Sequence, residues 1–236
     1  MSEITCVVLA VKTADGGDHA KVLVQREAEY VPHRNTVVTS ASIILNYECF
    51  SHRGFPTAGK NSGRFWGCYN SVFNTVSVTS SSMTAGGVFI DPEYLRGHRL
   101  GTYLMNEVVS WVKKWPEATV SPVRLYHNDG DEENTKRRNR FYQQFGLQFD
   151  FEDENCGNGL SREMKAQDLN NVDVSQKCGN IVSSTIGDYL RQAESDMVDA
   201  KNQIGMYDRT RQQLIDDVAI DKSDKGFLGR IAAFLR

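Results

Sequence analysis

The chain has 236 residues, of which 40% are hydrophobic, enough for one large domain or for a medium-sized domain with an appendage. Its 27 basic and 30 acidic residues leave a net charge of −3, so no global positive field exists to hold a polyanion such as DNA. A role on nucleic acid would therefore need a local basic patch.

Cysteine spacing and hydropathy favour a cytoplasmic protein. The five cysteines are widely spaced, with no Cys-x-x-Cys pair and no histidine at zinc-ligand spacing, so we expect reduced thiols and no metal site. The N-terminal residues lack a basic start followed by a long apolar run, and no window approaches the roughly 18 to 20 apolar residues of a membrane span. We expect a soluble, cytoplasmic chain without a membrane span.

Short stretches rich in β-branched, aromatic or alternating apolar residues predict a series of strands. They are residues 4–11, 20–25, 36–50, 64–70, 72–79, 86–90, 120–127 and 147–151. A Gly16-Gly17 turn joins the first two as a hairpin. Residues 51–63 collect Gly, Pro, Ser and charge, which indicates an exposed loop long enough to act as a substrate lid.

Two segments show helical patterns. Residues 100–115 carry Leu, Val and Trp at helical spacing, directly after Asp91 and Pro92 end the preceding strand. Residues 135–145 also have helical character, and Gly146 follows them at a typical C-cap position. The order is therefore strand, turn and amphipathic helix, then a second strand and helix.

The C-terminal third has a different composition. Residues 1–168 are predicted to form the main domain, 169–180 a polar linker, and 181–236 a helical extension. Apolar residues are sparse in that extension and Gly205 interrupts them, so a long stable coiled coil is not expected. A helical hairpin, an arm that contacts a second copy or another protein, and a mobile, partly helical tail remain alternatives.

The segment that carries chemistry runs from Gly86 to Met105, where a strand leads through a small-residue turn into a helix. That geometry directs several backbone N–H groups and the positive end of a helix dipole at one point, as in sites that hold a pyrophosphate. Gly97 and Gly101 fit this site because a side chain there would block close approach of the backbone.

The run Arg96-Gly97-His98-Arg99-Leu100-Gly101 resembles the Arg/Gln-x-x-Gly-x-Gly/Ala loop of the GCN5-related N-acetyltransferase (GNAT) superfamily. The sequence departs from that pattern at Arg99, where the family has glycine. The resemblance implies acetyl-CoA as acyl donor. It assigns contacts with acetyl-CoA to Val88, Phe89, Ile90, Arg96, Gly97, His98, Arg99, Leu100, Gly101, Thr102 and Asn134.

A second run about forty residues later, Asn139 to Leu147, resembles the family's Phe-Tyr-x-x-x-Gly-Phe element. The resemblance assigns Tyr142 as the general acid that protonates the departing CoA thiolate. The alternative is a tyrosine that anchors a helix to the sheet. The family's asparagine seven residues before this tyrosine is replaced by Thr135, with Asn134 one step earlier.

No residue stands out as the base that deprotonates the acceptor amine. Glu27, Glu29, Glu48 and His52 lie in the region that lines the acceptor site in the family, and Glu48 is our candidate. Residues 136–140 form the only concentrated basic run, which could meet the 3′-phosphate of CoA, an acidic partner or nucleic acid, or could be a solvated helix face.

The resemblance implies an α+β fold, with a mixed, mostly antiparallel central sheet flanked by helices and two parallel strands, near Val88 and Val123, that splay to admit the cofactor. The expected activity is transfer of an acetyl group to a primary amine of an unidentified acceptor. The alternatives are a catalytically inactive protein of the same fold that acts through its C-terminal helices, and a nucleic-acid- or tRNA-directed acyltransferase, which the acidic balance disfavours.

Overall fold

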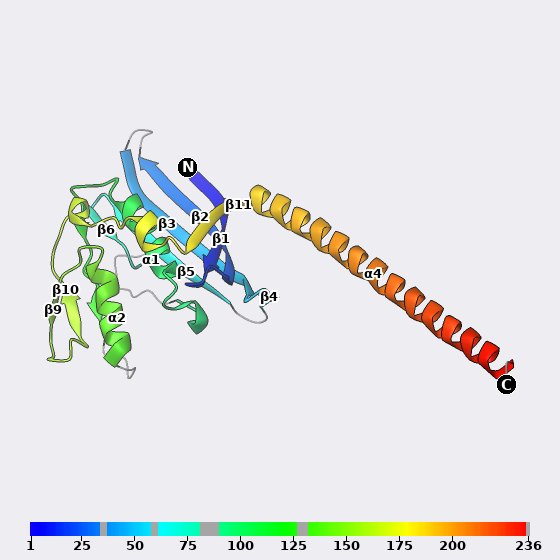
Figure 1. Cartoon of the computed structure of the whole chain (residues 1–236). Coiled ribbons are helices and arrows are strands. Elements are labelled where there is room, and N and C mark those ends of the chain that lie inside the picture. The colour runs from blue at the N-terminus through cyan, green and yellow to red at the C-terminus, as the bar shows by residue number, and fades with distance from the viewer. Residues whose placement is uncertain (34–36, 58–60, 81–89, 127–131, 235–236) are drawn as a thin grey trace. The chain divides into compact units, whose positions relative to one another are not determined.

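The structure is a computed structural model that describes residues 1–33, 37–57, 61–80, 90–126 and 132–234. The chain divides into two compact units, residues 1–186 and residues 187–236. The first unit has a mostly antiparallel central sheet with helices against it, which confirms the expected mixed α and β architecture (Figure 1).

The central sheet has the strand order β11-β1-β2-β3-β5-β6-β7, with β4 paired to β3. Its strands are β1 Ser2–Lys12, β2 Asp18–His33, β3 Val37–His52, β4 Phe55–Pro56, β5 Ser62–Asn70, β6 Thr75–Ser77, β7 Thr119–Val120 and β11 Ile181–Thr185. Along β3 the buried residues Ile43, Leu45 and Tyr47 alternate with more exposed ones, the pattern of a sheet with one face in the core. The predicted N-terminal hairpin is confirmed, and its strands are longer than expected.

Parallel pairing occurs at one place in the described sheet, between β6 and β7, where Val76 lies opposite Val120. The strand predicted over 120–127 is wrong as a single element, because Pro122 has no N–H to continue the ladder. Pairing with β6 ends with the hydrogen bond from Ser121 N to Val76 O, and Val123 then exchanges hydrogen bonds with Ser161 instead.

After Pro122 the chain enters a second, three-stranded sheet. It has the order β8-β10-β9, formed by β8 Arg124–Leu125, β9 Phe149–Phe151 and β10 Gly159–Ser161. In the described sheet the parallel pair joins residues 75–76 and 119–120, and Val123 belongs to neither strand. Residues 86–89 of the other expected strand lie outside the described residues, and Ile90 itself is not in a strand.

The helices of the first unit follow the predicted order. They are the 3₁₀ turn η1 Glu93–Leu95, α1 Leu100–Val112, α2 Glu132–Gln143, the 3₁₀ turn η2 Ala166–Asp168, and α3 Val174–Lys177. The α1 helix ends a turn earlier than the apolar pattern indicated, since Pro116 follows closely. Both main helices predicted from spacing are thus confirmed.

Residues 169–185 belong to the first unit, so the expected linker and the start of the helical extension are corrected. Leu169 is buried, its carbonyl accepts a hydrogen bond from Lys113 Nζ at 2.7 Å, and Val172 N donates to Asn106 Oδ1 at 2.9 Å. Strand β11 pairs antiparallel with β1. The polar composition concealed this packing, because β11 satisfies backbone groups at a sheet edge and buries few side chains.

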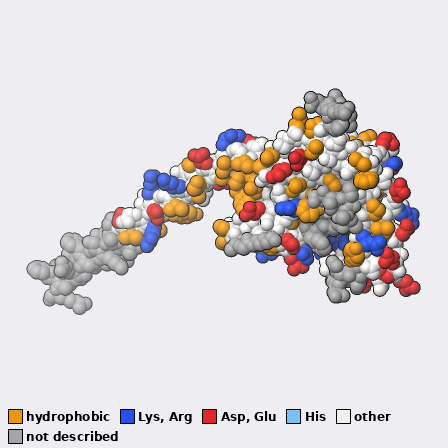
Figure 2. Space-filling view, turned by 180° about the vertical axis from the view of Figure 1, so that it is seen from behind, with side chains coloured by type: hydrophobic (Ala, Val, Ile, Leu, Met, Phe, Trp, Pro, Cys, Tyr) orange, Lys and Arg blue, Asp and Glu red, His pale blue; other side chains and the backbone are white. Residues whose placement is uncertain are grey.

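The second unit is formed by α4 Ile186–Phe234, a single helix of 49 residues. The helix is continuous through Gly205, so of the alternatives left open the hairpin is not the one formed, and a Cβ at Gly205 would have no neighbour within 4 Å. Figure 2 shows hydrophobic side chains along α4 among charged ones, over the part whose side chains are described. None of the helices in the described residues is long and apolar enough to cross a membrane.

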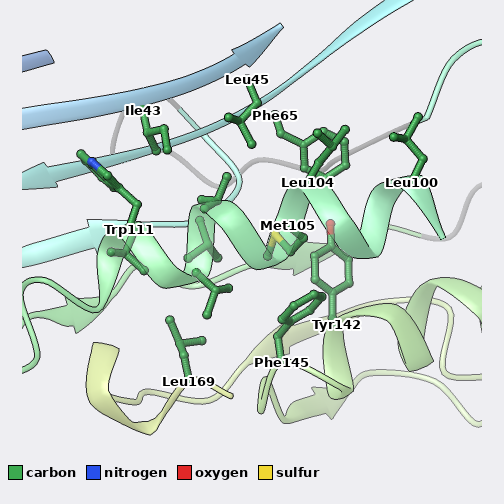
Figure 3. Packing of buried hydrophobic residues seen from close by; sticks show 14 of the residues in the cluster. Ile43, Leu45, Phe65, Leu100, Leu104, Met105, Trp111, Tyr142, Phe145 and Leu169 are labelled. Carbon is green, nitrogen blue, oxygen red and sulfur yellow. The ribbon is translucent and has the colours of Figure 1, made fainter. Parts of the chain in front are cut away.

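The hydrophobic core lies on both sides of α1 (Figure 3). On one side Leu104 and its neighbours meet Ile43, Leu45 and Phe65 of the sheet, and on the other side Tyr142 and Phe145 pack from α2 and the turn after it. Because α1 is buried on both sides, the position of its first turn is fixed by the core.

Candidate functional site

The glycine loop, residues 96–101, leads into the first turn of α1. Arg99 is the N-cap residue, and its side chain makes no capping hydrogen bond. The first intrahelical bond runs from Tyr103 N to Arg99 O at 3.0 Å. The N–H groups of Leu100, Gly101 and Thr102 therefore have no partner within the helix, and the positive end of the helix dipole lies at the same place.

The two glycines of the loop are needed for different reasons. Gly97 has a φ of +83°, in the left-handed region, but a Cβ there would have open space around it. Gly101 is helical, and a Cβ there would lie 3.3 Å from Ile90 Cγ1 and 3.6 Å from Phe141 Cε2. Gly97 therefore permits the turn, whereas Gly101 permits close packing of the first turn of α1.

Arg99 occupies the position where the sequence departs from the family pattern, and its backbone has the conformation that glycine favours. Its φ is 67° and its ψ is −1°, in the left-handed region. A residue with a side chain loses roughly 1 to 2 kcal/mol in that region. The Arg99 side chain is exposed at the start of α1, so it crowds no backbone group of the turn in the described structure.

Arg96 braces the loop from within. Its Nε donates to the Ile90 carbonyl at 2.9 Å, and its terminal nitrogens lie 3.3 Å from carboxylate oxygens of Asp91 and Glu93. The guanidinium thus links the start and the end of the segment from 90 to 96. In this arrangement its charge faces two carboxylates, and its main effect is to hold the turn before Gly97.

The structure brings together the two sequence motifs, which lie about forty residues apart in the chain. Gln144 Nε2 donates to Thr102 Oγ1 at 3.3 Å, so the end of α2 is hydrogen-bonded to the first turn of α1. Phe141 lies against Gly101, because a Cβ on this glycine would be 3.6 Å from Phe141 Cε2. Ile90 contacts the same glycine from the other segment, so three pieces of the chain meet at this point.

Tyr142 lies in the core beside this contact. Its side chain is 2% exposed, and its ring lies 5.1 Å from that of Phe141 and 5.9 Å from that of Phe149, measured between centroids. Figure 3 shows the ring directed from α2 toward α1. The position fits both sequence hypotheses, since a buried tyrosine anchors α2 and its hydroxyl also points toward the motif-bearing helix.

The remaining positions carried over from α2 face outward or are engaged. Asn134 is exposed and accepts a hydrogen bond from Arg137, while the adjacent Thr135 is buried. Arg138, from the middle of the basic run, donates to the carbonyls of Tyr126, Cys156 and Gly157. Burial lowers the pKa of the Arg138 guanidinium from its usual value. The run is therefore not a uniform exposed patch.

Glu48 lies on the sheet face opposite the residues that meet α1. It is exposed, whereas Tyr47 and Cys49 on either side of it are buried. The structure thus does not bring Glu48 to the loop. Its neighbour Tyr47 does reach the loop, because the Tyr47 hydroxyl accepts a hydrogen bond from Asp91 N at 2.9 Å. Burial raises the pKa of Tyr47, so this hydroxyl stays protonated.

A histidine stack, formed by His19, His52 and His98, lies beside the loop and was not predicted. The His19 and His98 rings are stacked with centroids 3.6 Å apart, and His52 meets His19 edge-on at 5.1 Å. The Tyr94 ring stacks on the His52 ring with centroids 4.1 Å apart, and the Tyr94 carbonyl oxygen lies 2.8 Å from His19 Nε2. The β2–β3 register, which places Ala20 opposite His52, is the one signal that could have paired the first two histidines.

Two imidazoles of the histidine stack have lowered pKa values. Burial, and then the neighbouring imidazoles, lower the pKa of His98, and burial followed by His19 and Arg53 lowers the pKa of His52. The Nε2 atom of His52 is buried without a hydrogen-bond partner. Stacked rings do not aim their nitrogens at a common point, and the described residues contain no group of three or more His, Cys, Asp or Glu side chains that could hold a metal ion.

The loop backbone is held on its outer side by the segment after α3. Asn180 Nδ2 donates to the His98 carbonyl at 3.1 Å, and Asn180 O accepts from Lys12 N at 2.7 Å. Residue 180 therefore ties the loop to the end of β1.

Comparison of the chain with protein-family models, with curated proteins and with solved structures finds no match.

Proposed function

We propose that this chain is an N-acetyltransferase of the GCN5-related type, which moves an acetyl group from acetyl-CoA to a primary amine of an acceptor. The observation that supports this proposal is the contact between the two motifs, in which Gln144 donates to Thr102 and Phe141 packs on Gly101. A pyrophosphate at the first turn of α1 would accept hydrogen bonds from N–H groups that have no helical partner.

The proposed chemistry is direct attack in a ternary complex. The acceptor nitrogen forms a bond with the thioester carbonyl carbon, the carbon–sulfur bond breaks, and its electron pair leaves with the CoA sulfur. The acceptor ammonium first loses a proton to a base or to water, so that the neutral amine attacks, and the nitrogen loses a second proton to solvent once the C–N bond has formed. By the resemblance, the Tyr142 hydroxyl gives its proton to the departing thiolate and regains one from solvent. Val88, Phe89 and Ile90 would contact the pantetheine arm through backbone groups.

A second candidate is a protein of the same fold that binds CoA or a partner and catalyses nothing. The burial of Tyr142 within the aromatic cluster favours it, because a structural tyrosine needs no other explanation there. The Tyr142 hydroxyl distinguishes the two candidates. In an enzyme, Tyr142→Phe would abolish or strongly slow acetyl transfer, whereas in the second candidate neither the unmodified chain nor the variant would transfer an acetyl group. CoA binding would be unchanged in both cases.

The test of the CoA site is isothermal titration of the purified chain with acetyl-CoA and with CoA. The decisive variant is Arg99→Glu, since the Arg99 side chain is exposed and a carboxylate at a helix N-terminus does not harm folding. We expect affinity to fall by about tenfold or more, because the carboxylate repels the pyrophosphate. Gly101→Trp, which would displace Ile90 and Phe141, should abolish binding.

Arg99→Gly is the matched control for the titration. It removes the same side chain without adding negative charge and suits the left-handed backbone, so binding should persist and folding should be at least as stable. Absence of binding by the unmodified chain would refute the proposal. Binding without thiol release across a panel of amines would favour the non-catalytic candidate.

A further inference from the structure

Most of the exposed large hydrophobic residues of α4 follow a seven-residue repeat, and Val198, Met206 and Ile215 lie outside it. From Ile186 to Leu214 the residues of the repeat recur at alternating spacings of four and three residues, the a and d positions of a heptad. In order along the helix, these positions are Ile186, Leu190, Ala193, Met197, Ala200, Ile204, Tyr207, Arg211 and Leu214. Only Arg211 among them is neither aliphatic, aromatic nor Met, so the repeat continues for four heptads.

These side chains are exposed in the single chain. Leu190 is 60% exposed, Met197 69%, Ile204 62% and Tyr207 76%, whereas Leu100, Leu104 and Met105 of α1 are 0% exposed. The repeat of 3.5 residues keeps such a stripe on one side of a helix only if the helix winds around another helix of the same kind. The stripe therefore has the pattern of a coiled-coil seam that lacks its partner helix.

Polar residues occupy many of the other positions of the same heptads, and some of them are hydrogen-bonded or paired within the helix. Gln192 donates to Asp196, Gln212 donates to Asp216, and Arg191 pairs with Asp188. Gly205 falls at a b position, on the side away from the seam, so its missing side chain removes nothing from the seam. This explains why a glycine in mid-helix is compatible with a long coiled coil.

We infer that α4 forms a parallel, two-stranded coiled coil with the α4 helix of a second copy of this chain. The charges flanking the seam support a second copy as the partner. In a parallel pair each g position faces the e position of the next heptad on the partner, which sets Asp196 against Lys201 and Gln203 against Asp208. No such pair between residues 186 and 216 joins two charges of the same sign.

Arg211 is the one charged residue of the seam. In register, it lies opposite its own copy at an a position, where a polar residue lowers stability and fixes register and the number of helices. Asp208 is one turn earlier on the same helix and can lie near the guanidinium. The coiled coil does not depend on the proposed acetyl transfer, because α4 belongs to a unit separate from the glycine loop.

The test is the molar mass of the full chain in solution, measured by sedimentation equilibrium from submicromolar to high micromolar concentration. We expect the unmodified chain to have twice the monomer mass. Ile204→Asp should give a monomer, because it places a carboxylate in the seam. The matched control is Met206→Asp, at a c position and 68% exposed against 62% for Ile204, which should remain dimeric.

Arg211→Leu should shift the equilibrium the other way, lowering the dissociation constant by about tenfold or more. A monomeric unmodified chain, or a dimer that Ile204→Asp leaves intact, overturns the inference. Ile204→Asp, Met206→Asp and Arg211→Leu all lie in the second unit. Near-ultraviolet circular dichroism, which reports tertiary packing around the tryptophans of the first unit, should therefore not change.

The parallel orientation has a separate test. Ala193→Cys lies at a d position near the start of α4, so in a parallel pair the two new thiols meet and oxidise to a disulfide-linked dimer. In an antiparallel pair of 49-residue helices these positions would be tens of ångströms apart. Ser195→Cys, on the outer face, is the control that should not crosslink, and a dimer that Ala193→Cys fails to crosslink overturns the parallel arrangement.

Discussion

The helices α1 and α4 contain similar apolar residues and differ in what surrounds them. In α1, Leu100 and Leu104 are 0% exposed, between the sheet and α2, whereas in α4 Leu190 is 60% exposed. The buried helix fixes its own N-terminus, which is what a backbone-built anion site requires. The exposed helix carries a regular apolar repeat on its surface, which the inferred second copy of the chain would cover.

The largest expected difference between the two helices is in stability. Leu104→Ala should lower the free energy of unfolding by about 2 to 5 kcal/mol, because it opens a cavity in a site that is 0% exposed. Leu190→Ala, in the second unit, should change the free energy of unfolding of the first unit by less than about 0.5 kcal/mol.

Urea unfolding followed by tryptophan fluorescence measures this contrast directly. The three tryptophans, Trp66, Trp111 and Trp115, all belong to the first unit, so the signal does not report on α4. A large loss with Leu190→Ala would mean that α4 contributes to the stability of the first unit, and the contrast drawn between the helices would fail.

An intermediate effect is expected in the basic run of α2, where two arginines two positions apart have different surroundings. Arg138→Ala should cost roughly 1.5 to 3 kcal/mol, because it removes the charged donor from the carbonyls of Tyr126 and Gly157, whereas the Cys156 carbonyl keeps its bond from Asn139. Arg140→Ala, at an exposed position, should change stability by less than about 0.5 kcal/mol. Equally small effects of the two substitutions would show that the run is a solvated helix face throughout.

The smallest expected effect is a pH dependence from the histidine stack. The pKa values of His52 and His98 are lowered in the folded chain, mainly by burial, while the unfolded chain titrates near the usual value of about 6.5. As pH falls through that value the unfolded state takes up protons that the folded state does not, so stability should fall. Above it both states are neutral, and the two histidines contribute no pH dependence.

His52→Phe tests this origin of the pH dependence. The phenyl ring can still stack on Tyr94, and it replaces the buried Nε2 that has no hydrogen-bond partner. Urea midpoints should therefore be similar for both proteins at about pH 7.5 and should decline less for the variant at about pH 5.5. An unchanged slope between the two pH values would place the effect on other groups.

Local patterns predicted the elements near the candidate site, because each depends on neighbours in sequence. The apolar spacing of 100–115 and the turn residues at Gly97 and Gly146 were sufficient for α1, the loop and the end of α2. Strand β11 was missed because its residues are polar and its pairing is with β1, far away in sequence. The long α4 helix was underestimated because Gly205 was weighed without regard to the face on which it lies.

The sequence by itself determined the mixed order of strands and helices, the glycine loop at the start of a helix and the seven-residue repeat of α4, since these follow from backbone preference and from spacing along one element. Only the tertiary structure decided that Gln144 meets Thr102, that Glu48 lies on the far face of the sheet, and that three histidine rings come together beside the loop. Such contacts join residues from distant strands and turns, and they depend on how the sheet pairs and how α1 is buried, which no local pattern encodes.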